Sequence, residues 1–182
     1  RRALVIVTGY FGERLATMLA RYGAAIDRLD VEWGRAVDPA EVARALATRH
    51  NLRSIVLWGP GEERLAQDVV TASDGTAAVS PPTTLADLVS LTKAAAVMIS
   101  GDTGPMHVAG ASGTPLIGIF GPTDPARNGP WSEDDLTVSR FGSCSCHYQR
   151  RCRIAAWCLL DISPREVMDL VDRRLTGLSA HA

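Results

Sequence analysis

Short hydrophobic runs alternate with segments whose apolar residues recur at helical spacing along most of the chain. A short apolar run between turn residues is typical of a buried strand in a parallel sheet, whereas three- and four-residue spacing is typical of an amphipathic helix. Strands are predicted over residues 3–8, 26–33, 54–58, 77–80, 96–100 and 115–121. Helices are predicted over residues 13–22, 38–49, 62–73, 84–95, from 103 onward and from 163 to about 175. This alternation predicts an α/β fold, a Rossmann-like open and mostly parallel sheet with helices on both faces.

Three of the predicted helices begin with a recognisable cap. Asp38 is followed by a proline and, in the third position, a glutamate, and the segment Ser163–Glu166 repeats this pattern. Thr84 precedes Asp87 by three residues. A Ser, Thr or Asp side chain at such a place accepts hydrogen bonds from the free amides of the first turn. Residues 121–131, by contrast, are rich in proline and glycine and predict a loop.

The sequence SGDTGPMHVAG, residues 100–110, leads from one predicted strand into the next helix. In open α/β sheets, ligands bind at the carboxyl ends of strands beside helix N-termini. Gly101 and Gly104 allow close backbone approach, and Asp102 and Thr103 are suited to cap the helix. The free amides and the helix dipole attract an anion such as a pyrophosphate, and His107 lies one turn further on. An ordinary capped turn with a buried histidine fits the same residues.

Two other strand ends carry polar residues and are expected at the same edge of the sheet. The segment IFGPTDPARNGPW follows one strand and offers Gly121, Thr123 and Asp124. The segment WGPGEE follows another, and its Glu62 or Glu63 could accept hydrogen bonds from a ribose or sugar hydroxyl. Either glutamate also fits a simpler role, in which its charge complements the dipole of the helix that begins there.

Composition excludes several classes of protein. The 182 residues are 46% hydrophobic, enough for one sizeable core, and the net charge of −1 gives no reason to expect a nucleic-acid partner. The sequence has neither an apolar run long enough to span a membrane nor a secretion signal. We therefore expect a cytoplasmic protein. Since the chain begins with Arg1 rather than Met, we expect it to be a trimmed domain or part of a longer protein.

All four cysteines fall in one short segment, CSCHYQRRCRIAAWC, with His147 beside them. They are Cys144, Cys146, Cys152 and Cys158. Four thiolates can hold a tetrahedral zinc ion, although C-x-C is less usual than C-x2-C in structural zinc sites. Reduced buried thiols and disulfides are the alternatives, and disulfides are rare in the cytoplasm.

Taken together, these strand-end motifs and the cysteine segment resemble glycosyltransferase family 9, the lipopolysaccharide heptosyltransferases, over about residues 52–175. The resemblance implies the C-terminal, donor-binding half of a GT-B architecture, with an ADP-heptose-like nucleotide sugar as partner, no required cofactor and a direct inverting displacement. It implies Asp102 near the donor sugar, Thr103 and Gly104 at the pyrophosphate, His107 close by, and Glu63, or else Glu62, at the ribose. It also implies an N-terminal acceptor domain that this chain lacks, which would carry the catalytic base and could bring the full enzyme to the inner membrane as a peripheral protein.

Residues 3–47 differ, and are similar instead to class V aminotransferases of the serine–glyoxylate type. The stretches GYFGERLATMLARYGA and VEWGRAVDP carry this likeness. A pyridoxal enzyme needs a lysine for its cofactor, and the only lysine, Lys93, falls within a predicted helix. We therefore expect one α/β domain built as a mosaic, with an aminotransferase-like part at 1–48 and a donor-binding part at 49–182. The alternatives are a natural or engineered chimera without turnover and, less favoured, an aminotransferase fragment.

Overall fold

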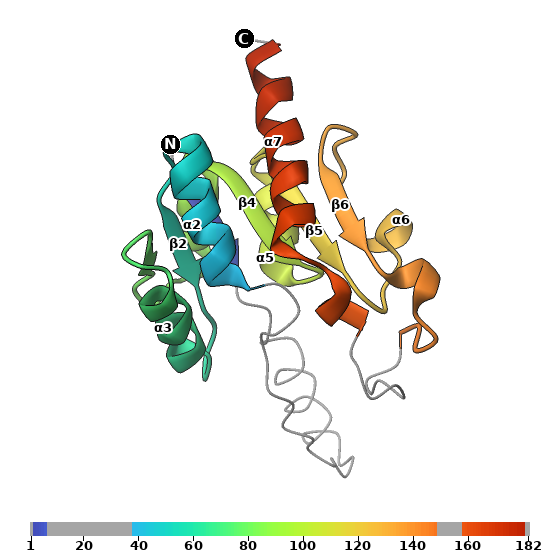
Figure 1. Ribbon diagram of the computed structural model, residues 1–182, viewed down its shortest axis with the longest axis horizontal. Helices are drawn as coiled ribbons and strands as arrows, with labels where there is room; N and C mark the ends of the chain where they lie inside the picture. Colours follow the sequence, from blue (N-terminus) through green and yellow to red (C-terminus); the bar gives the residue numbers. More distant parts are fainter. Residues whose placement is uncertain (1, 7–37, 149–157, 181–182) are drawn as a thin grey trace.

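The computed structural model describes residues 2–6, 38–148 and 158–180. Within these residues all the strands are parallel and form one open sheet in the order β3-β2-β1-β4-β5-β6 (Figure 1). The strands are β1 (Arg2–Ile6), β2 (Ser54–Leu57), β3 (Ala77–Val79), β4 (Ala95–Gly101), β5 (Leu116–Phe120) and β6 (Leu136–Ser139). This order confirms the predicted Rossmann-like α/β fold, and its direction of winding reverses between β1 and β4.

Helices cover both faces of the sheet. In the view of Figure 1, α2 (Pro39–His50) and α7 (Pro164–Ala180) lie side by side in front of the sheet, with α3 (Glu63–Ala72) next to β2 and β3. The opposite face is covered by α4 (Leu85–Ala94) and α5 (Gly104–Ala111). Short helices complete the fold: α6 (Pro125–Asn128), η1 (Phe141–Ser143) and η2 (Cys158–Asp161).

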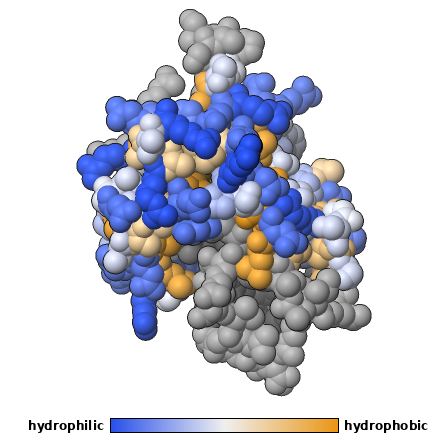
Figure 2. Space-filling model, in the orientation of Figure 1, coloured by the Kyte–Doolittle hydropathy of each residue, from blue (hydrophilic) through white to orange (hydrophobic). Residues whose placement is uncertain are grey.

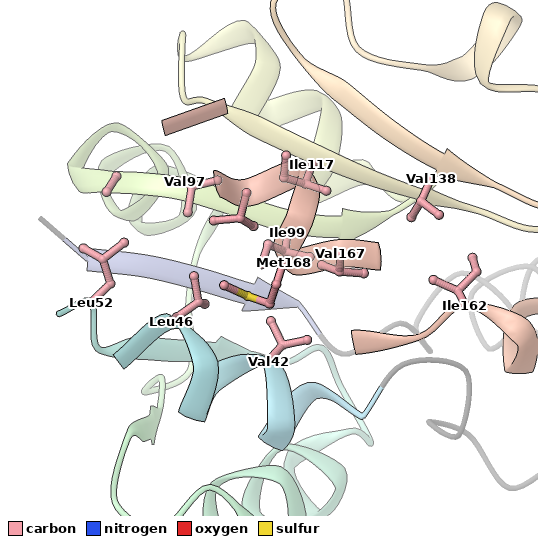
Figure 3. Close-up of a cluster of buried hydrophobic side chains, with 12 residues drawn as sticks. Val42, Leu46, Leu52, Val97, Ile99, Ile117, Val138, Ile162, Val167 and Met168 are labelled. Carbon is pink, nitrogen blue, oxygen red and sulfur yellow. The ribbon is translucent and has the colours of Figure 1, made fainter. Parts of the chain in front are cut away.

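The core lies in two layers, one on each side of β4. Val97 and Ile99 point into the layer beneath α2 and α7, together with Leu46 and Met168 (Figure 3). Met98, between them in the sequence, points to the other layer, beneath α4 and α5. Because successive strand residues face opposite sides, a strand buried on both faces needs an uninterrupted apolar run. This is why residues 96–100 could be recognised as a strand from the sequence.

The outer surface of the molecule is more polar than this core. Most of the described surface in Figure 2 is hydrophilic, with hydrophobic side chains showing between polar ones. None of the helices in the described residues is long and apolar enough to cross a membrane.

The predicted caps are present. The Asp38 carboxylate accepts hydrogen bonds from the backbone N–H groups of Ala40 and Glu41 at the start of α2. Thr84 and Asp87 form a reciprocal capping box on α4. At the start of α7, the Ser163 N–H donates to Glu166 at 2.8 Å and the Glu166 N–H donates to Ser163 at 3.2 Å. These local bonds explain why the predicted beginnings of the three helices agree closely with the structure.

Two predictions between residues 121 and 140 need correction. Residues 121–131 are not only a loop, because Pro125–Asn128 forms one helical turn capped by Asp124. Strand β6 was not predicted, since its four residues, LTVS, give too short a pattern, and its place is set by pairing with β5. The helix predicted at 13–22 and the strand predicted at 26–33 lie outside the described residues.

Helix α7 is fixed to the sheet by a buried ion pair. Arg174 Nε lies 3.1 Å from Asp135 Oδ1, and the two side chains are 11% and 3% exposed. The same carboxylate oxygen accepts the backbone N–H of Leu116 at 2.9 Å, so it joins α7 to the beginnings of β5 and β6. Asp172, two residues before Arg174 in α7, contacts Arg49 and His50 of α2 at 3.1 and 2.6 Å. The ion pair at Asp135 holds α7 in place at its C-terminal half.

We expect Arg174→Ala to lower the free energy of unfolding by about 3–5 kcal/mol, because it leaves the Asp135 carboxylate buried without its partner. Chemical denaturation measures this loss. Arg173→Ala is the matched control, since Arg173 is exposed on the same helix. Its effect should stay within about 0.5 kcal/mol. Equal losses for the two variants would contradict the role assigned to the buried pair.

Candidate functional site

The polar segments predicted from the sequence do lie along one edge of the sheet. Because β2, β4 and β5 are parallel strands of one sheet, their carboxyl ends face the same way. Glu62 follows β2, Asp102 follows β4 and Thr123 follows β5. We call this row of strand ends the carboxyl edge. Lys93 lies outside it, since the last turn of α4 leads into the opposite, amino end of β4.

The N-terminus of α5 lies at this edge and carries no side-chain cap among the described residues. Thr103 occupies the N-cap position but makes no side-chain cap, contrary to the predicted capping role. Its hydroxyl lies instead 3.2 Å from the Ser100 hydroxyl and 3.4 Å from the Gly101 carbonyl oxygen. A Cβ added to Gly104 would meet no described atom within 4 Å. Among the described residues no side chain caps the first amides of α5, and uncapped amides at a helix N-terminus suit an anionic ligand.

Asp102 turns its carboxylate across the edge toward the next loop. Its Oδ2 accepts a hydrogen bond from Asn128 Nδ2 at 2.9 Å. His107 Nε2 is 3.8 Å from Oδ1, beyond hydrogen-bond distance, and the His107 side chain is 53% exposed. Within the described part of the chain, no hydrogen bond to Oδ1 is present. Among the described residues, one carboxylate oxygen is therefore held by a hydrogen bond, while the other has only the longer contact with His107.

The two adjacent glutamates occupy different environments. Glu62 is 7% exposed, and its Oε2 accepts the Gly59 N–H at 3.0 Å. Its other oxygen, Oε1, is buried and has no partner among the residues that the structure describes. Burial raises the pKa of the Glu62 carboxyl, and the Gly59 hydrogen bond opposes this rise. Glu63 is the first residue of α3 and is exposed. Helical geometry thus separates two residues that the sequence could not distinguish.

The loop after β5 is held from outside by Tyr148. The Tyr148 backbone N–H donates to the Pro122 carbonyl at 3.0 Å, and the Asp124 N–H donates to the Tyr148 hydroxyl at 3.3 Å. Gly121 is buried, and a Cβ there would lie 2.9 Å from a carbon of Leu159. Close packing of η2 therefore accounts for this glycine. Thr123 is half-buried in the same loop.

Arg140 closes the base of the segment that contains the cysteines. Its guanidinium donates hydrogen bonds to the Asp161 carbonyl and to Glu166 Oε1, both at 2.7 Å. The backbone N–H of Ser163 and the guanidinium of Arg140 hold the pKa of Glu166 below its usual value. The two ends of the segment between β6 and α7 are thereby joined at the start of α7.

The cysteine prediction is tested only in part. Cys144 and Cys146 are buried, and the Cys146 N–H donates to Cys144 Sγ at 3.3 Å. Cys152 lies outside the described residues. Among residues 2–6, 38–148 and 158–180, no three His, Cys, Asp or Glu side chains are grouped closely enough to hold a metal ion. The zinc site therefore stays a prediction.

The strand order and the parallel pairing define a Rossmann-like domain of the α/β class. Comparison with known sequences identifies the family within this class of folds. The sequence profile of glycosyltransferase family 9 (heptosyltransferase) matches residues 38–158. The chain belongs to this family.

Individual relatives agree with the family assignment. The lipopolysaccharide core heptosyltransferase OpsX of Haemophilus influenzae is 31% identical over 107 residues, which are 56% of this chain and 30% of that protein. The structure of E. coli ADP-heptose lipopolysaccharide heptosyltransferase II superposes with a TM-score of 0.67 at 18% identity, covering 98% of this chain and 48% of that one. The structure of E. coli heptosyltransferase WaaC with ADP superposes with a TM-score of 0.64 at 19% identity, covering 95% of this chain and 44% of that one. The fold is therefore that of the GT-B heptosyltransferases, and the chain spans about a third to a half of the length of these relatives.

The resemblance to aminotransferases is supported by a shorter sequence match. An uncharacterized aminotransferase of Methanocaldococcus jannaschii is 38% identical over 56 residues, which are 31% of this chain and 14% of that protein. The family 9 match begins at residue 38, so it includes α2 and overlaps the part at 1–48 that we assigned to the aminotransferase-like segment. The boundary at residues 48 and 49 remains a prediction.

The sequence alone did not single out Asn128, which the structure brings into contact with Asp102. The dipeptide Asn128-Gly129 indicates a turn, and that signal was present in the sequence. Its partner Asp102 is 26 residues away, however, and no local pattern connects the two. Asn128 comes to Asp102 only because β4 and β5 are neighbours in the sheet.

We expect Glu62→Gln to become more stabilising, relative to the native chain, as the pH rises. A raised pKa means that the folded protein holds this proton more tightly than the unfolded chain does. The contribution to stability is therefore complete below the unfolded pKa and is lost as the pH rises through the folded pKa. Glutamine does not ionise, so the Glu62→Gln variant keeps its stability over the pH range in which the native chain loses this contribution.

Denaturation of both proteins between about pH 4 and about pH 7 measures this difference. The exposed neighbour provides the control, because Glu63→Gln should show a nearly constant difference over the same range. A flat profile for Glu62→Gln would contradict the buried environment described for this carboxyl.

Proposed function

We propose that this chain binds the nucleotide-sugar donor of a family 9 glycosyltransferase, with ADP-heptose or a close relative as the donor. The related WaaC protein has been solved with ADP and with ADP-2-deoxy-2-fluoro heptose, which supports this class of ligand. The reaction would be the transfer of a heptose in the synthesis of lipopolysaccharide or a related glycan. The carboxyl edge is the part of the chain that would hold the donor.

One observation carries this proposal: two carboxylates at the carboxyl edge each have one oxygen held by a protein hydrogen bond and one that accepts no hydrogen bond from the described residues. Asn128 holds Asp102, and the Gly59 amide holds Glu62. A buried acceptor without a partner is costly, and a hydroxyl-rich ligand supplies the missing donors. A nucleotide sugar offers hydroxyls on both its ribose and its sugar.

We assign the ribose to Glu62 and the donor sugar to Asp102. The resemblance to the family pointed first to Glu63 for the ribose. Glu62 is favoured here because it is buried, with an oxygen that lacks a partner among the described residues, whereas Glu63 is exposed. For Asp102, Oδ1 lies beside the N-terminus of α5, where the sugar would be joined to the diphosphate.

The diphosphate would lie at the N-terminus of α5. The amides at Thr103 and Gly104, together with the helix dipole, would offset its charge, and His107 would lie beside it. When the acceptor attacks the anomeric carbon, the bond to the diphosphate breaks and negative charge develops on the departing oxygen. Fixed amides at that position stabilise this charge without a bound metal or other cofactor. Gly121 and Thr123 would border the site from the neighbouring loop.

The acceptor and the catalytic base would come from outside this chain. The chain covers only 48% of heptosyltransferase II and 44% of WaaC, which leaves room in those proteins for a second domain. We therefore propose donor binding for this chain by itself and transfer only together with an acceptor domain. A cytoplasmic location stays a prediction for this chain, and peripheral contact with the inner membrane stays one for the complete enzyme.

A chimeric α/β protein without turnover is the second candidate, and the 56-residue aminotransferase match favours it. A pyridoxal-dependent fragment is less consistent with the fold, because Lys93 lies at the amino end of β4. A borohydride-stable pyridoxal adduct at Lys93 would support that fragment.

We expect ADP to bind the chain in a calorimetric titration, with Asp102→Ala and His107→Ala weakening the binding of ADP-heptose. Glu62→Gln should weaken the binding of ADP by about tenfold or more, because a lost hydrogen bond to a charged group is worth about 1.5–3 kcal/mol. Glu63→Gln should change it by less than about twofold, because its side chain points to solvent.

Failure of ADP, UDP and GDP to bind at millimolar concentration would overturn the proposed function and favour the chimera without turnover. Equal losses for the two glutamate variants would leave donor binding in place but remove the assignment of the ribose to Glu62.

A further inference from the structure

We propose that Asn128 is a positioning residue for the donor sugar, acting by fixing the carboxylate of Asp102. The proposal rests on the proposed function, since it assigns a role within the same site. It starts from the bond that joins two loops of the carboxyl edge, in which Asn128 Nδ2 donates to Asp102 Oδ2 at 2.9 Å.

The geometry of the bond selects one orientation of the carboxylate. A carboxylate rotates over a broad range about its terminal torsion, so its two oxygens exchange places unless something holds one of them. The Asn128 amide occupies Oδ2, and this directs Oδ1 toward His107, whose Nε2 is 3.8 Å away. A sugar hydroxyl that donates to Oδ1 then meets an acceptor already in position, which lowers the ordering cost of binding.

Asn128 is itself held by its backbone. Its N–H donates to the Asp124 carbonyl at 2.9 Å, and the next N–H, that of Gly129, donates to the Pro125 carbonyl at 2.8 Å. A Cβ on Gly129 would lie 2.2 Å from the Pro125 oxygen, so only glycine fits there. The turn therefore ends directly after Asn128 and presents its side chain to Asp102.

The same turn is also anchored by Tyr148. Tyr148 accepts the Asp124 N–H at 3.3 Å, and the Arg127 guanidinium lies 5.6 Å from the centre of the Tyr148 ring. These contacts tie α6 to the segment after β6. The Asn128 amide is thus supported by backbone and ring contacts, none of which uses its side chain.

The side chain has no comparable structural use within the described residues. An asparagine that served only to end α6 would bond to the backbone of its own turn. The Asn128 side chain instead bonds across the edge, to a half-buried carboxylate at the end of another strand. Its removal should therefore affect the ligand more than the fold.

The test measures the binding of ADP and ADP-heptose to the full chain by calorimetry. We expect Asn128→Ala to weaken the binding of ADP-heptose by about tenfold, equivalent to about 1.4 kcal/mol, and to leave the affinity for ADP nearly unchanged. Asn128→Asp should weaken ADP-heptose further, since it places a second carboxylate at hydrogen-bond distance from the first. Gln67→Ala, which removes an amide from the exposed surface of α3, is the matched control and should change neither affinity.

A double-mutant cycle separates positioning from a general loss of structure. If Asn128 acts through Asp102, Asn128→Ala should cost nothing further in an Asp102→Ala background, where no side-chain oxygen is left to orient. Thermal unfolding of every variant identifies any that fails to fold. If Asn128→Ala fails to fold, Asn128→Asp, whose side chain has the same shape, provides a second measurement of the role of Asn128.

Two outcomes overturn the assignment in different ways. If the native chain binds ADP-heptose and Asp102→Ala weakens it while neither Asn128 variant does, the positioning role fails and the donor site stands. Equal weakening of ADP and ADP-heptose by Asn128→Ala, or full additivity in the cycle, also removes the role. If the native chain binds neither ligand, the proposed function fails and the assignment fails with it.

Discussion

Strand β4 is buried on both faces and paired on both sides, and the position of Asp102 depends on this. Val97 and Ile99 fill one layer of the core while Met98 fills the other, so the strand cannot shift along its neighbours without moving apolar side chains out of both layers. Its register is also fixed by hydrogen bonding to β1 and β5. The turn at residues 102–104 therefore begins at a point that the core determines, and the amides of α5 are aimed by packing rather than by a capping side chain.

Polar contacts then relate the loops to one another. Asn128 connects the turn after β4 to the loop after β5, and Tyr148 connects that loop to the segment after β6. Arg140 joins the two ends of this last segment through Asp161 and Glu166. The core sets the strand ends, and this series of hydrogen bonds sets the loops between them. Loops are generally the most variable part of an α/β fold, and here they are restrained one by another.

The sequence predicted those features that depend on local interactions. The beginnings of α2, α4 and α7 could be recognised because Asp38, Thr84 and Ser163 bond within their own first turns. The choice between Glu62 and Glu63 could not be made, because it depends on which face of the helix turns toward Gly59. Strand β6 and the contact between Asn128 and Asp102 were missed for a related reason: each is defined by pairing across the sheet, between residues distant in the chain. The same sheet neighbourhood had been used correctly to group the three strand ends, so the limit lay in single side-chain contacts.

The central place of β1 has a consequence for how the chain is made. Among the described strands β1 comes first in the sequence, yet it pairs with β2 and β4, whose residues 54–57 and 95–101 follow much later. Among the described strands it alone joins the β3-β2 pair to the β4-β5-β6 group. Until it is inserted, each half has an open edge that can pair with another molecule. Non-local parallel pairing is slow and leaves such edges exposed for longer. A nascent chain of this protein should therefore depend on chaperones more than a helical protein of the same length does.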